Sequence, residues 1–136
     1  MELYTEAPAV YDAADYFVEA GDWIVWQLTG KQTRNSCMTG YKGLYTDDGY
    51  PSPAFLSALE PGLQNVAAEK WGAHIPVQPI GSRAGYLTPE WAAKTGLTTD
   101  CAVSDAVIDG HAAVPAAGVH QSGQLLAIMG TSTCHM

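Results

Sequence analysis

Two short groups of residues in the second half of the chain have the types and spacing that phosphate chemistry needs. Asp109 is followed by Gly110 and His111 at the start of an alanine-rich segment, and a carboxylate that opens a helix after a strand can be directed into a cleft as a general base for a substrate hydroxyl. Residues 130–133 read Gly-Thr-Ser-Thr, a turn that offers N–H groups and hydroxyls to a phosphate without a bulky side chain in the way. Together they indicate phosphoryl transfer. Each alone is weak, because an aspartate at a helix start is commonly an ordinary cap and Gly-Thr-Ser-Thr is a common turn.

The elements that would position these groups follow from the placement of apolar residues, glycines and prolines. Helical spacing predicts two helices, or one bent helix, over 10–17 and 23–28, with Asp22 as a cap and Gly30 as the stop. Residues 31–53 are rich in glycine and polar residues, which predicts a loop with at most one short strand. The remaining expectations before the chemical groups are helices over 53–59 and 63–72, an extended stretch over 73–85, a helix over 89–95 and a buried strand over 101–108.

The last predicted elements carry the two chemical groups. Residues 109–118 are alanine-rich and are expected to be helical, with Pro115 as a kink or as the true start. Residues 125–129 are an apolar run, which predicts a strand leading into the Gly-Thr-Ser-Thr turn. Only 134–136 remain to pair with that strand, and two or three strands cannot cover so many helices. We therefore expect a piece of a larger protein, with a domain junction at the turn-forming residues 117–123.

Composition and charge narrow the class of protein. The 136 residues are 47% hydrophobic and 15% charged, which is typical of a folded domain and not of a disordered segment. The 14 acidic and 6 scattered basic residues give a net charge of -8, which argues against nucleic acid or an anionic membrane as a partner. No apolar run reaches the roughly 20 residues of a membrane-spanning helix, and the acidic start argues against a secretory signal. We therefore expect a cytoplasmic protein.

The cysteines and histidines predict neither a disulfide framework nor a metal site. Cys37, Cys101 and Cys134 are an odd number at wide spacing, which fits a reducing compartment. Zinc needs ligands at a closer and more regular spacing than Cys37, His74, Cys134 and His135 provide. A hydrolase triad around Ser132 would lack the Gly-x-Ser-x-Gly elbow. We expect no metal ligands among these residues.

Several segments together resemble the FGGY carbohydrate kinases, and the resemblance covers nearly the whole chain. Leu-Thr-Gly at 28–30 and Ala-Gly-Tyr-Leu-Thr at 84–88 are shared across the wider sugar and polyol kinase family. Asn-Ser-Cys at 35–37 with Gly-Tyr-Lys at 40–42, and the closing Met-Gly-Thr-Ser-Thr-Cys-His-Met at 129–136, are similar to the members that phosphorylate L-ribulose. The matching stretches are 22–30, 34–37, 40–42, 84–88, 109–111 with Pro115, and 129–136.

The resemblance implies a fold, a reaction and a set of site residues. The fold is α/β, of the actin-like ATPase (ribonuclease H-like) kind, with residues 1–118 as the later part of the sugar-binding domain and 119–136 as the opening hairpin of the ATP-binding domain. The reaction is phosphorylation of L-ribulose, or a related ketopentose, to the 5-phosphate in L-arabinose catabolism, with ATP and Mg²⁺ as cofactors and a homo-oligomer as one option for the full-length protein. The implied site residues are Asp109 as the base, Lys42 and His111 as sugar contacts, and Gly130, Thr131 and Ser132 as the turn that holds the ATP phosphates.

The chain also departs from the family pattern close to the base. Ala106 and Val107 stand where small polar residues are common. Asp105 adds a second carboxylate on the same side of a strand as Asp109, where it can raise the pKa of the base if the two are close. The Mg²⁺ ligands, the adenine pocket and the first phosphate loop of the family have no counterpart, so we expect this chain alone to be inactive.

Other interpretations stay open beside this one. Without the resemblance, Lys42 is a solvated loop lysine and His111 is a structural histidine between two domains. Another pentulose or polyol kinase, such as one that acts on xylulose, would share most of these motifs. A non-catalytic module that binds sugar or ATP is the alternative from a different class.

Overall fold

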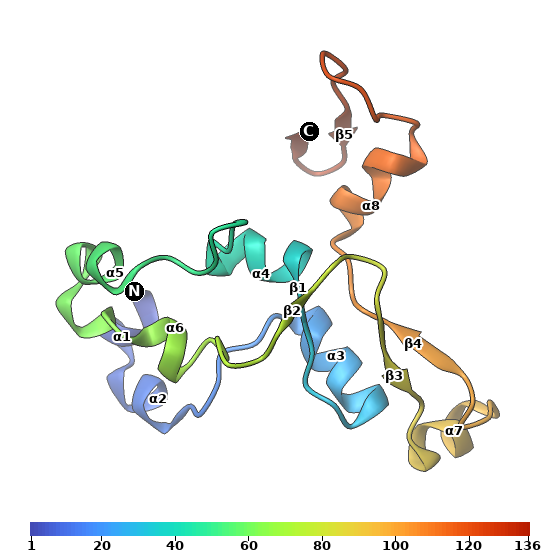
Figure 1. The fold of residues 1–136 in the computed structure, drawn as a ribbon, viewed down its shortest axis with the longest axis horizontal. Coiled ribbons are helices and arrows are strands. Elements are labelled where there is room, and N and C mark those ends of the chain that lie inside the picture. Colours follow the sequence, from blue (N-terminus) through green and yellow to red (C-terminus); the bar gives the residue numbers. More distant parts are fainter.

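Three two-stranded sheets and a set of short helices form the 136 residues that the computed structural model describes. This mixture of helix and strand agrees with the α/β class expected from the sequence. Figure 1 shows an N-terminal helical lobe on one side, a central part, and an arm that carries the C-terminus. No helix of the chain combines the length and the apolar character needed to cross a membrane.

Apolar packing holds the N-terminal lobe together. Ser52 Oγ accepts a hydrogen bond from the Phe55 N–H at 3.2 Å and so begins α5 at the predicted residue. The core consists of Tyr11, Leu56, Leu63, Val66 and Ala67. The lobe contains α1 (Glu2–Glu6), α2 (Pro8–Ala13), α5 (Pro53–Leu59), the 3-10 turn η1 (Pro61–Leu63) and α6 (Val66–Glu69).

Two predicted helices of this lobe are wrong in their bounds. Pro8 at the first helical position begins α2 earlier than expected, and the helix ends at Ala13 because Phe17 is part of an extended segment whose N–H bonds to the Lys70 carbonyl at 2.8 Å. The helix expected over 63–72 is instead a 3-10 turn begun by Pro61, followed by the short α6.

The central part contains α3 (Ala20–Thr29), β1 (Arg34–Asn35), α4 (Ser36–Gly43) and β2 (Val77–Gln78), with β1 and β2 paired in parallel. Gly30 ends α3 with a φ of 68°, as predicted. The loop predicted over 31–53 is wrong at α4, because Asn35 Oδ1 accepts from the N–H groups of Cys37 at 2.9 Å and Met38 at 3.0 Å and begins a helix. Asp22 is not the cap of α3, since Glu19 occupies that position.

A third part consists of β3 (Arg83–Tyr86) and β4 (Ala102–Ser104), which pair antiparallel, with α7 (Pro89–Thr95) between them in the chain. The helix predicted over 89–95 is confirmed: Thr88 Oγ1 accepts from the Trp91 N–H at 3.4 Å, and Gly96 ends the helix with a φ of 73°. The strand expected to be buried over 101–108 is shorter and mostly exposed: Ala102 and Ser104 of β4 face solvent, and beyond Ser104 the chain leaves the sheet and leads to the C-terminal arm.

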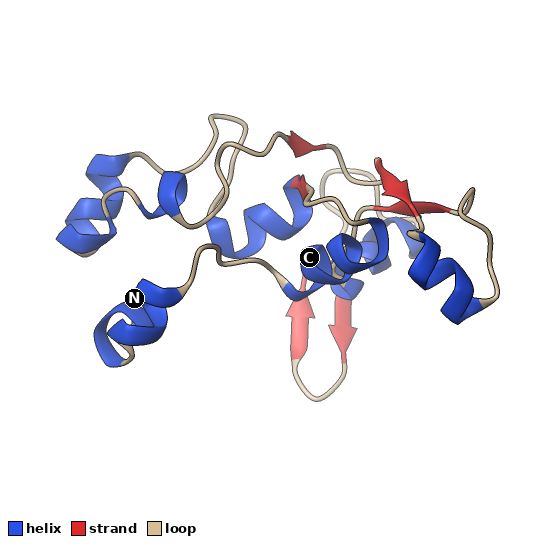
Figure 2. Cartoon of the chain, turned by 90° about the horizontal axis from the view of Figure 1, so that it is seen from below, coloured by secondary structure: helices blue, strands red, loops and turns tan.

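The C-terminal arm consists of α8 (Asp109–Ala116) and a hairpin of β5 (Ala127–Met129) and β6 (Thr133–His135). The strand and its short return are therefore confirmed, with Ala127 opposite His135 in the register. Pro115 lies inside the last turn of α8, which ends two residues earlier than expected. Figure 2 shows the hairpin extending from the rest of the chain, with its turn at the far end.

Candidate active site

Asp109 is the first residue of α8, and its side chain is exposed. Its Oδ1 accepts a hydrogen bond from the Gly110 N–H at 2.7 Å, so the free N–H groups at the helix start help to hold the carboxylate. The other carboxylate oxygen has no protein partner. An exposed, oriented carboxylate of this kind is suited to accept a proton from a bound hydroxyl.

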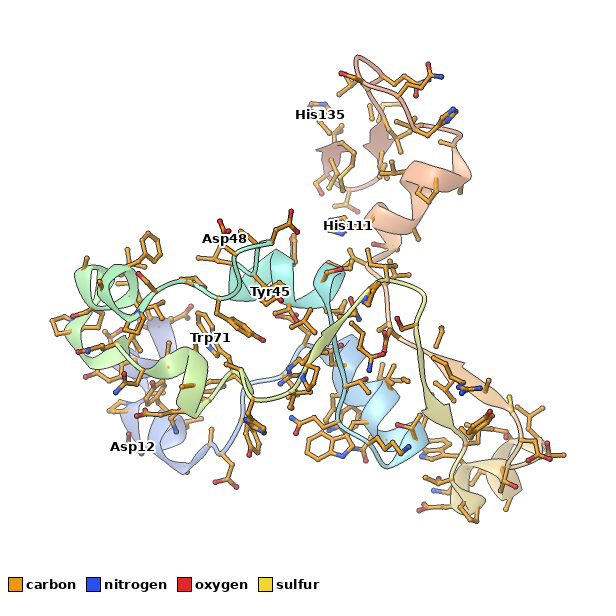
Figure 3. The ribbon with its side chains drawn as sticks, viewed as in Figure 1. Asp12, Tyr45, Asp48, Trp71, His111 and His135 are labelled. Carbon is orange, nitrogen blue, oxygen red and sulfur yellow. The ribbon has the colours of Figure 1, made fainter.

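His111 connects α8 to α4. Its Nδ1 lies 3.0 Å from Cys37 Sγ, and its ring meets the Tyr41 ring edge to face, with centroids 6.0 Å apart. These two contacts join residues that are far apart in the sequence. Figure 3 shows His111 at the start of α8, facing the central part of the chain.

Lys42 lies in the last turn of α4 and is exposed. Its Nζ is 6.0 Å from the centroid of the Tyr41 ring, so the same tyrosine neighbours both Lys42 and His111. The structure thus brings the helix of Lys42 beside the helix of Asp109.

The side-chain amide of a buried asparagine fixes the chain segment that leads into α8. Asn35 is fully buried, and its Nδ2 donates to the Ala106 carbonyl at 2.9 Å while its Oδ1 caps α4. The start of α8 also packs closely on the hairpin, because a Cβ on Gly110 would lie 3.4 Å from Met136 Cε and 3.7 Å from Ile128 Cδ1.

A buried ion pair lies next to this amide. Arg34 Nη1 is 3.2 Å from Asp22 Oδ2, and both side chains are at most 4% exposed. Burial raises the pKa of Asp22 to about 6, although Arg34 acts in the opposite direction. Asp105 is also buried, neither of its carboxylate oxygens has a hydrogen-bond partner, and burial raises its pKa. The negative charge of Asp105 also raises the pKa of Asp22. Asp105 is buried, whereas Asp109 is exposed to solvent.

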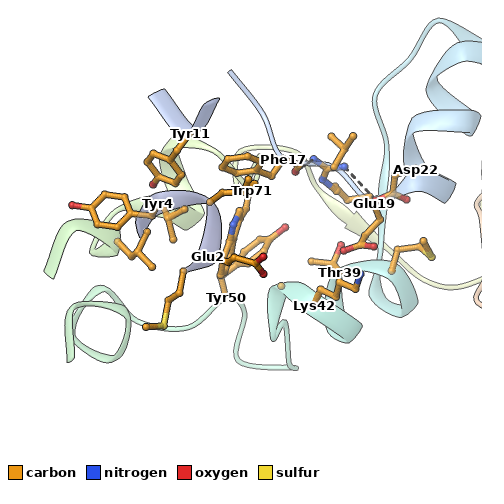
Figure 4. A pocket seen from close by; sticks show the side chains of 18 residues that line it. Glu2, Tyr4, Tyr11, Phe17, Glu19, Asp22, Thr39, Lys42, Tyr50 and Trp71 are labelled. Carbon is orange, nitrogen blue, oxygen red and sulfur yellow. Dashed lines mark hydrogen bonds and ion pairs between the residues drawn. The ribbon is translucent and has the colours of Figure 1, made fainter. Parts of the chain in front are cut away.

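A cavity of about 360 Å³ lies between the N-terminal lobe and α4. Lys42 lines it together with the buried ion pair, Glu19 and the rings of Tyr50 and Trp71 (Figure 4). Asp109 and His111 do not line it, and His111 borders a separate, mostly apolar hollow with Met136. Lys42 therefore reaches one concave surface and His111 another.

The turn at Gly130, Thr131 and Ser132 is fully exposed. Gly130 N–H donates to the Ser132 carbonyl at 2.9 Å, while the N–H groups of Thr131 and Ser132 donate to no other group. Free backbone donors on small residues fit a phosphate. The hairpin atoms nearest to Gly110 at the start of α8 belong to Ile128 and Met136, and the turn lies at the far end of the hairpin (Figure 2).

The polar cluster under the site is what the sequence interpretation missed. The sequence pattern predicts a loop at Asn35 and a helix cap at Asp22, and it predicts no structural role for Arg34. The signal that could have found the cap is Asn35 itself, because asparagine is a preferred residue at the start of a helix. Nothing in local spacing indicates that Arg34 reaches Asp22 or that Asn35 reaches Ala106, since both contacts are tertiary.

The fit to cofactors is partial. Two free N–H groups in the hairpin turn suit ATP phosphates, whereas nowhere in the chain do three or more His, Cys, Asp or Glu side chains gather around a possible metal position. An exposed carboxylate, a cation on a neighbouring helix and a small-residue turn are groups that phosphoryl transfer uses, although the structure does not bring the three together. Their types are compatible with the class of the carbohydrate kinases.

Comparison with known proteins agrees with this class. The chain is 46% identical over 136 residues to a ribulokinase of Geobacillus thermodenitrificans, which covers 99% of the chain and 24% of the relative. It is 47% identical over 137 residues to the ribulokinase of Bacillus licheniformis, and 48% over 136 residues to that of Halalkalibacterium halodurans, again with 24% of each relative covered. No protein-family model matches the chain. The chain is therefore a ribulokinase-like segment, and it spans about a quarter of the length of the curated relatives that it matches.

Proposed function

We propose that this chain works as part of an ATP-dependent kinase that phosphorylates the terminal hydroxyl of L-ribulose to give the 5-phosphate, in L-arabinose catabolism in the cytoplasm. The observation that carries the proposal is the contact between α4 and α8, through Cys37, Tyr41 and His111, because it places Lys42 and Asp109 on neighbouring helices. The similarity to ribulokinases along the whole chain supports the same substrate class.

Asp109 is the general base in this proposal. Its exposed oxygen accepts the proton of the attacking hydroxyl while the Gly110 N–H holds the other oxygen in place. Phosphoryl transfer passes through a loose transition state, so the base contributes through orientation and through late removal of the proton. Lys42 and His111 are the sugar contacts in this proposal, which requires the two concave surfaces that they reach to come together around the sugar.

The hairpin turn is the proposed phosphate site. Thr131 and Ser132 have free N–H groups and exposed hydroxyls, and Gly130 leaves space for the phosphates. ATP with Mg²⁺ supplies the phosphoryl group and neutralises its charge when bound. For the turn to act together with Asp109, the hairpin and α8 must close toward each other, which fits two domains that divide at about residue 118 in an actin-like fold.

The isolated chain is not expected to carry out the reaction. Asp109 and the turn do not meet in it, and neither adenine-binding groups nor a cluster of metal ligands are evident. The activity therefore belongs to a chain of the length of the relatives, called here the full-length protein.

The test is a kinase assay on the full-length protein with L-ribulose, D-xylulose and ribitol, measuring ADP release. We expect L-ribulose to be the preferred substrate and Asp109→Asn to lower the rate by about 10² to 10⁴. The exposed Asp100 provides a matched control, since Asp100→Asn makes the same change in charge far from the site.

Three outcomes would overturn this proposal. Strong turnover of D-xylulose without turnover of L-ribulose would make the protein a different pentulose kinase. Equal rates for Asp109→Asn and the parent would remove Asp109 as the base, and binding of sugar and ATP without any ADP release would indicate a non-catalytic module.

A further inference from the structure

Asn35 links the two helices of the candidate site through one side chain. It is 0% exposed. Its Oδ1 accepts from the first free N–H groups of α4, at 2.9 Å and 3.0 Å, and its Nδ2 donates to the Ala106 carbonyl at 2.9 Å. An amide is the side chain that can serve both directions, because it has an acceptor and a donor on the same rigid plane.

The two ends of this link lead directly to the functional side chains. The capped helix α4 carries Lys42 in its last turn, and a helix transmits the position of its start to its end. Ala106 lies three residues before Asp109, in the segment between β4 and α8. The Asn35 side chain therefore fixes the relative positions of the two segments that carry Lys42 and Asp109.

Close packing around Asn35 leaves little freedom for this link to shift. A Cβ on Gly21 would lie 2.8 Å from Ala106 Cβ and 2.9 Å from Met38 Cε, which is closer than side chains normally approach. Gly21 thus allows α3 to press against both ends of the link. Within 105–108, the Asp105 N–H also bonds to the Ser82 carbonyl at 3.0 Å, but that bond leads back to the β3 side and away from α4.

We propose that Asn35 is a positioning residue that holds the Asp109 segment at a fixed distance from the Lys42 helix, and that it acts on the rate of the chemical step more than on sugar binding. The rate effect rests on the proposed function, whereas the structural link does not. Misplacement of reacting groups by about 1 Å can lower a rate by about 10².

Asn35→Ser tests the two hydrogen-bonding roles of Asn35 separately. A serine Oγ can still cap α4 but is too short to reach the Ala106 carbonyl. Hydrogen exchange on the full-length protein should therefore show faster exchange at 109–112 and unchanged protection of the Cys37 and Met38 N–H groups. In the kinase assay we expect kcat to fall by about 10- to 100-fold, with KM for the sugar within about two-fold of the parent.

Ser52→Ala is the matched control, because it removes a helix cap of the same kind from α5, far from the site. It should lower stability by about 1 kcal/mol without changing kcat or the exchange at 109–112. Gly21→Ala is a second, independent variant: it pushes on Ala106 and Met38 without touching Asn35, so it should reproduce the fall in kcat even if Asn35→Ser does not fold.

The outcomes separate this inference from the proposed function. If the parent phosphorylates no ketopentose, the proposed function fails, and the exchange pattern of Asn35→Ser still decides whether the link exists. If the parent is active but Asn35→Ser and Gly21→Ala behave like Ser52→Ala in kcat and in exchange, the positioning role is overturned.

Discussion

The N-terminal lobe and the junction under the candidate site bury similar numbers of side chains, but those of the lobe are apolar and those of the junction are polar or charged. The lobe packs Tyr11, Leu56 and their apolar neighbours into a cluster with no charge inside it. The junction between α3, β1 and the start of α8 buries Asp22, Arg34, Asn35 and Asp105. Apolar burial is insensitive to direction and to pH, whereas buried polar groups are stable only in one arrangement.

This difference suggests a division of roles. The lobe supplies packing energy and tolerates small adjustments of shape. The junction fixes geometry where Asn35 joins the start of α4, the helix that carries Lys42, to Ala106, three residues before Asp109. The side chains proposed to meet the substrate stay exposed, so they are free to react while the residues behind them are held.

The largest effect is expected from breaking the buried ion pair. Arg34→Met leaves the Asp22 carboxylate buried without its partner, and such losses cost about 3–5 kcal/mol. Urea unfolding of the full-length protein should therefore shift strongly to lower denaturant concentration.

The double variant Asp22→Leu with Arg34→Met sharpens this test, since replacing both partners by apolar side chains of similar size is often near neutral. We expect the double variant to be clearly more stable than Arg34→Met alone. If the two are equally destabilised, loss of packing and not an unpaired charge explains the effect.

A somewhat smaller loss is expected in the lobe. Leu56 is 3% exposed and belongs to the apolar core, so Leu56→Ala should lower stability by about 2–4 kcal/mol through lost burial and the cavity it leaves. Because Leu56 is far from the polar junction, kcat at low temperature should not change. A fall in kcat as large as that of Asn35→Ser would show that the two regions are not separable.

The pH dependence of stability is expected to come from the polar junction and not from the N-terminal lobe. The pKa of Asp22 is raised from 3.8 to about 6 in the folded chain, and that of Asp105 is raised as well. At pH values between the unfolded and folded pKa of Asp22, the folded state binds more protons than the unfolded state. The free energy of unfolding therefore falls as the pH rises from about 4 to about 6. The expected loss is on the order of 2 kcal/mol.

Asp22→Asn should remove most of this dependence, because an amide does not titrate. Urea unfolding at a series of pH values measures it, with Leu56→Ala as the control that keeps the slope of the parent. A parent whose stability rises over the same range would contradict the raised pKa of Asp22.

The fold was predictable from the sequence where local chemistry decides it. Thr88, Pro89 and Gly96 mark α7, and the apolar run before Gly130 marks β5, so both are confirmed. The local pattern does not predict α4, because its residues, Gly40 and Gly43 among them, have weak helix propensity, and its start depends on the Asn35 side chain.

The site was predictable in its members but not in its arrangement. The types of Asp109 and His111, and the small residues of the hairpin turn, are visible in the sequence. That His111 meets Cys37, and that the hairpin turn points away from α8, depends on tertiary contacts that no local pattern encodes. Asp105 illustrates the limit, since period-two alternation predicts the same side as Asp109 only while the strand continues, and the strand ends at Ser104.

The smallest expected effect tests the weakest link between the helices, which is the contact of Cys37 with His111. The thiol lies 3.0 Å from Nδ1, and in this geometry it can hold the imidazole in the tautomer that keeps the proton on Nε2, where it can donate to a sugar hydroxyl.

Cys37→Ala removes this contact and leaves Asn35, Tyr41 and the cap of α4 in place. A net hydrogen bond contributes about 1 kcal/mol, so KM for the sugar should rise about five-fold with kcat nearly unchanged. Cys37→Ser, whose hydroxyl can make the same bond, should recover most of the affinity. If alanine and serine raise KM equally, Cys37 acts by filling space, and the two helices are positioned by Asn35 and by the Tyr41–His111 ring contact.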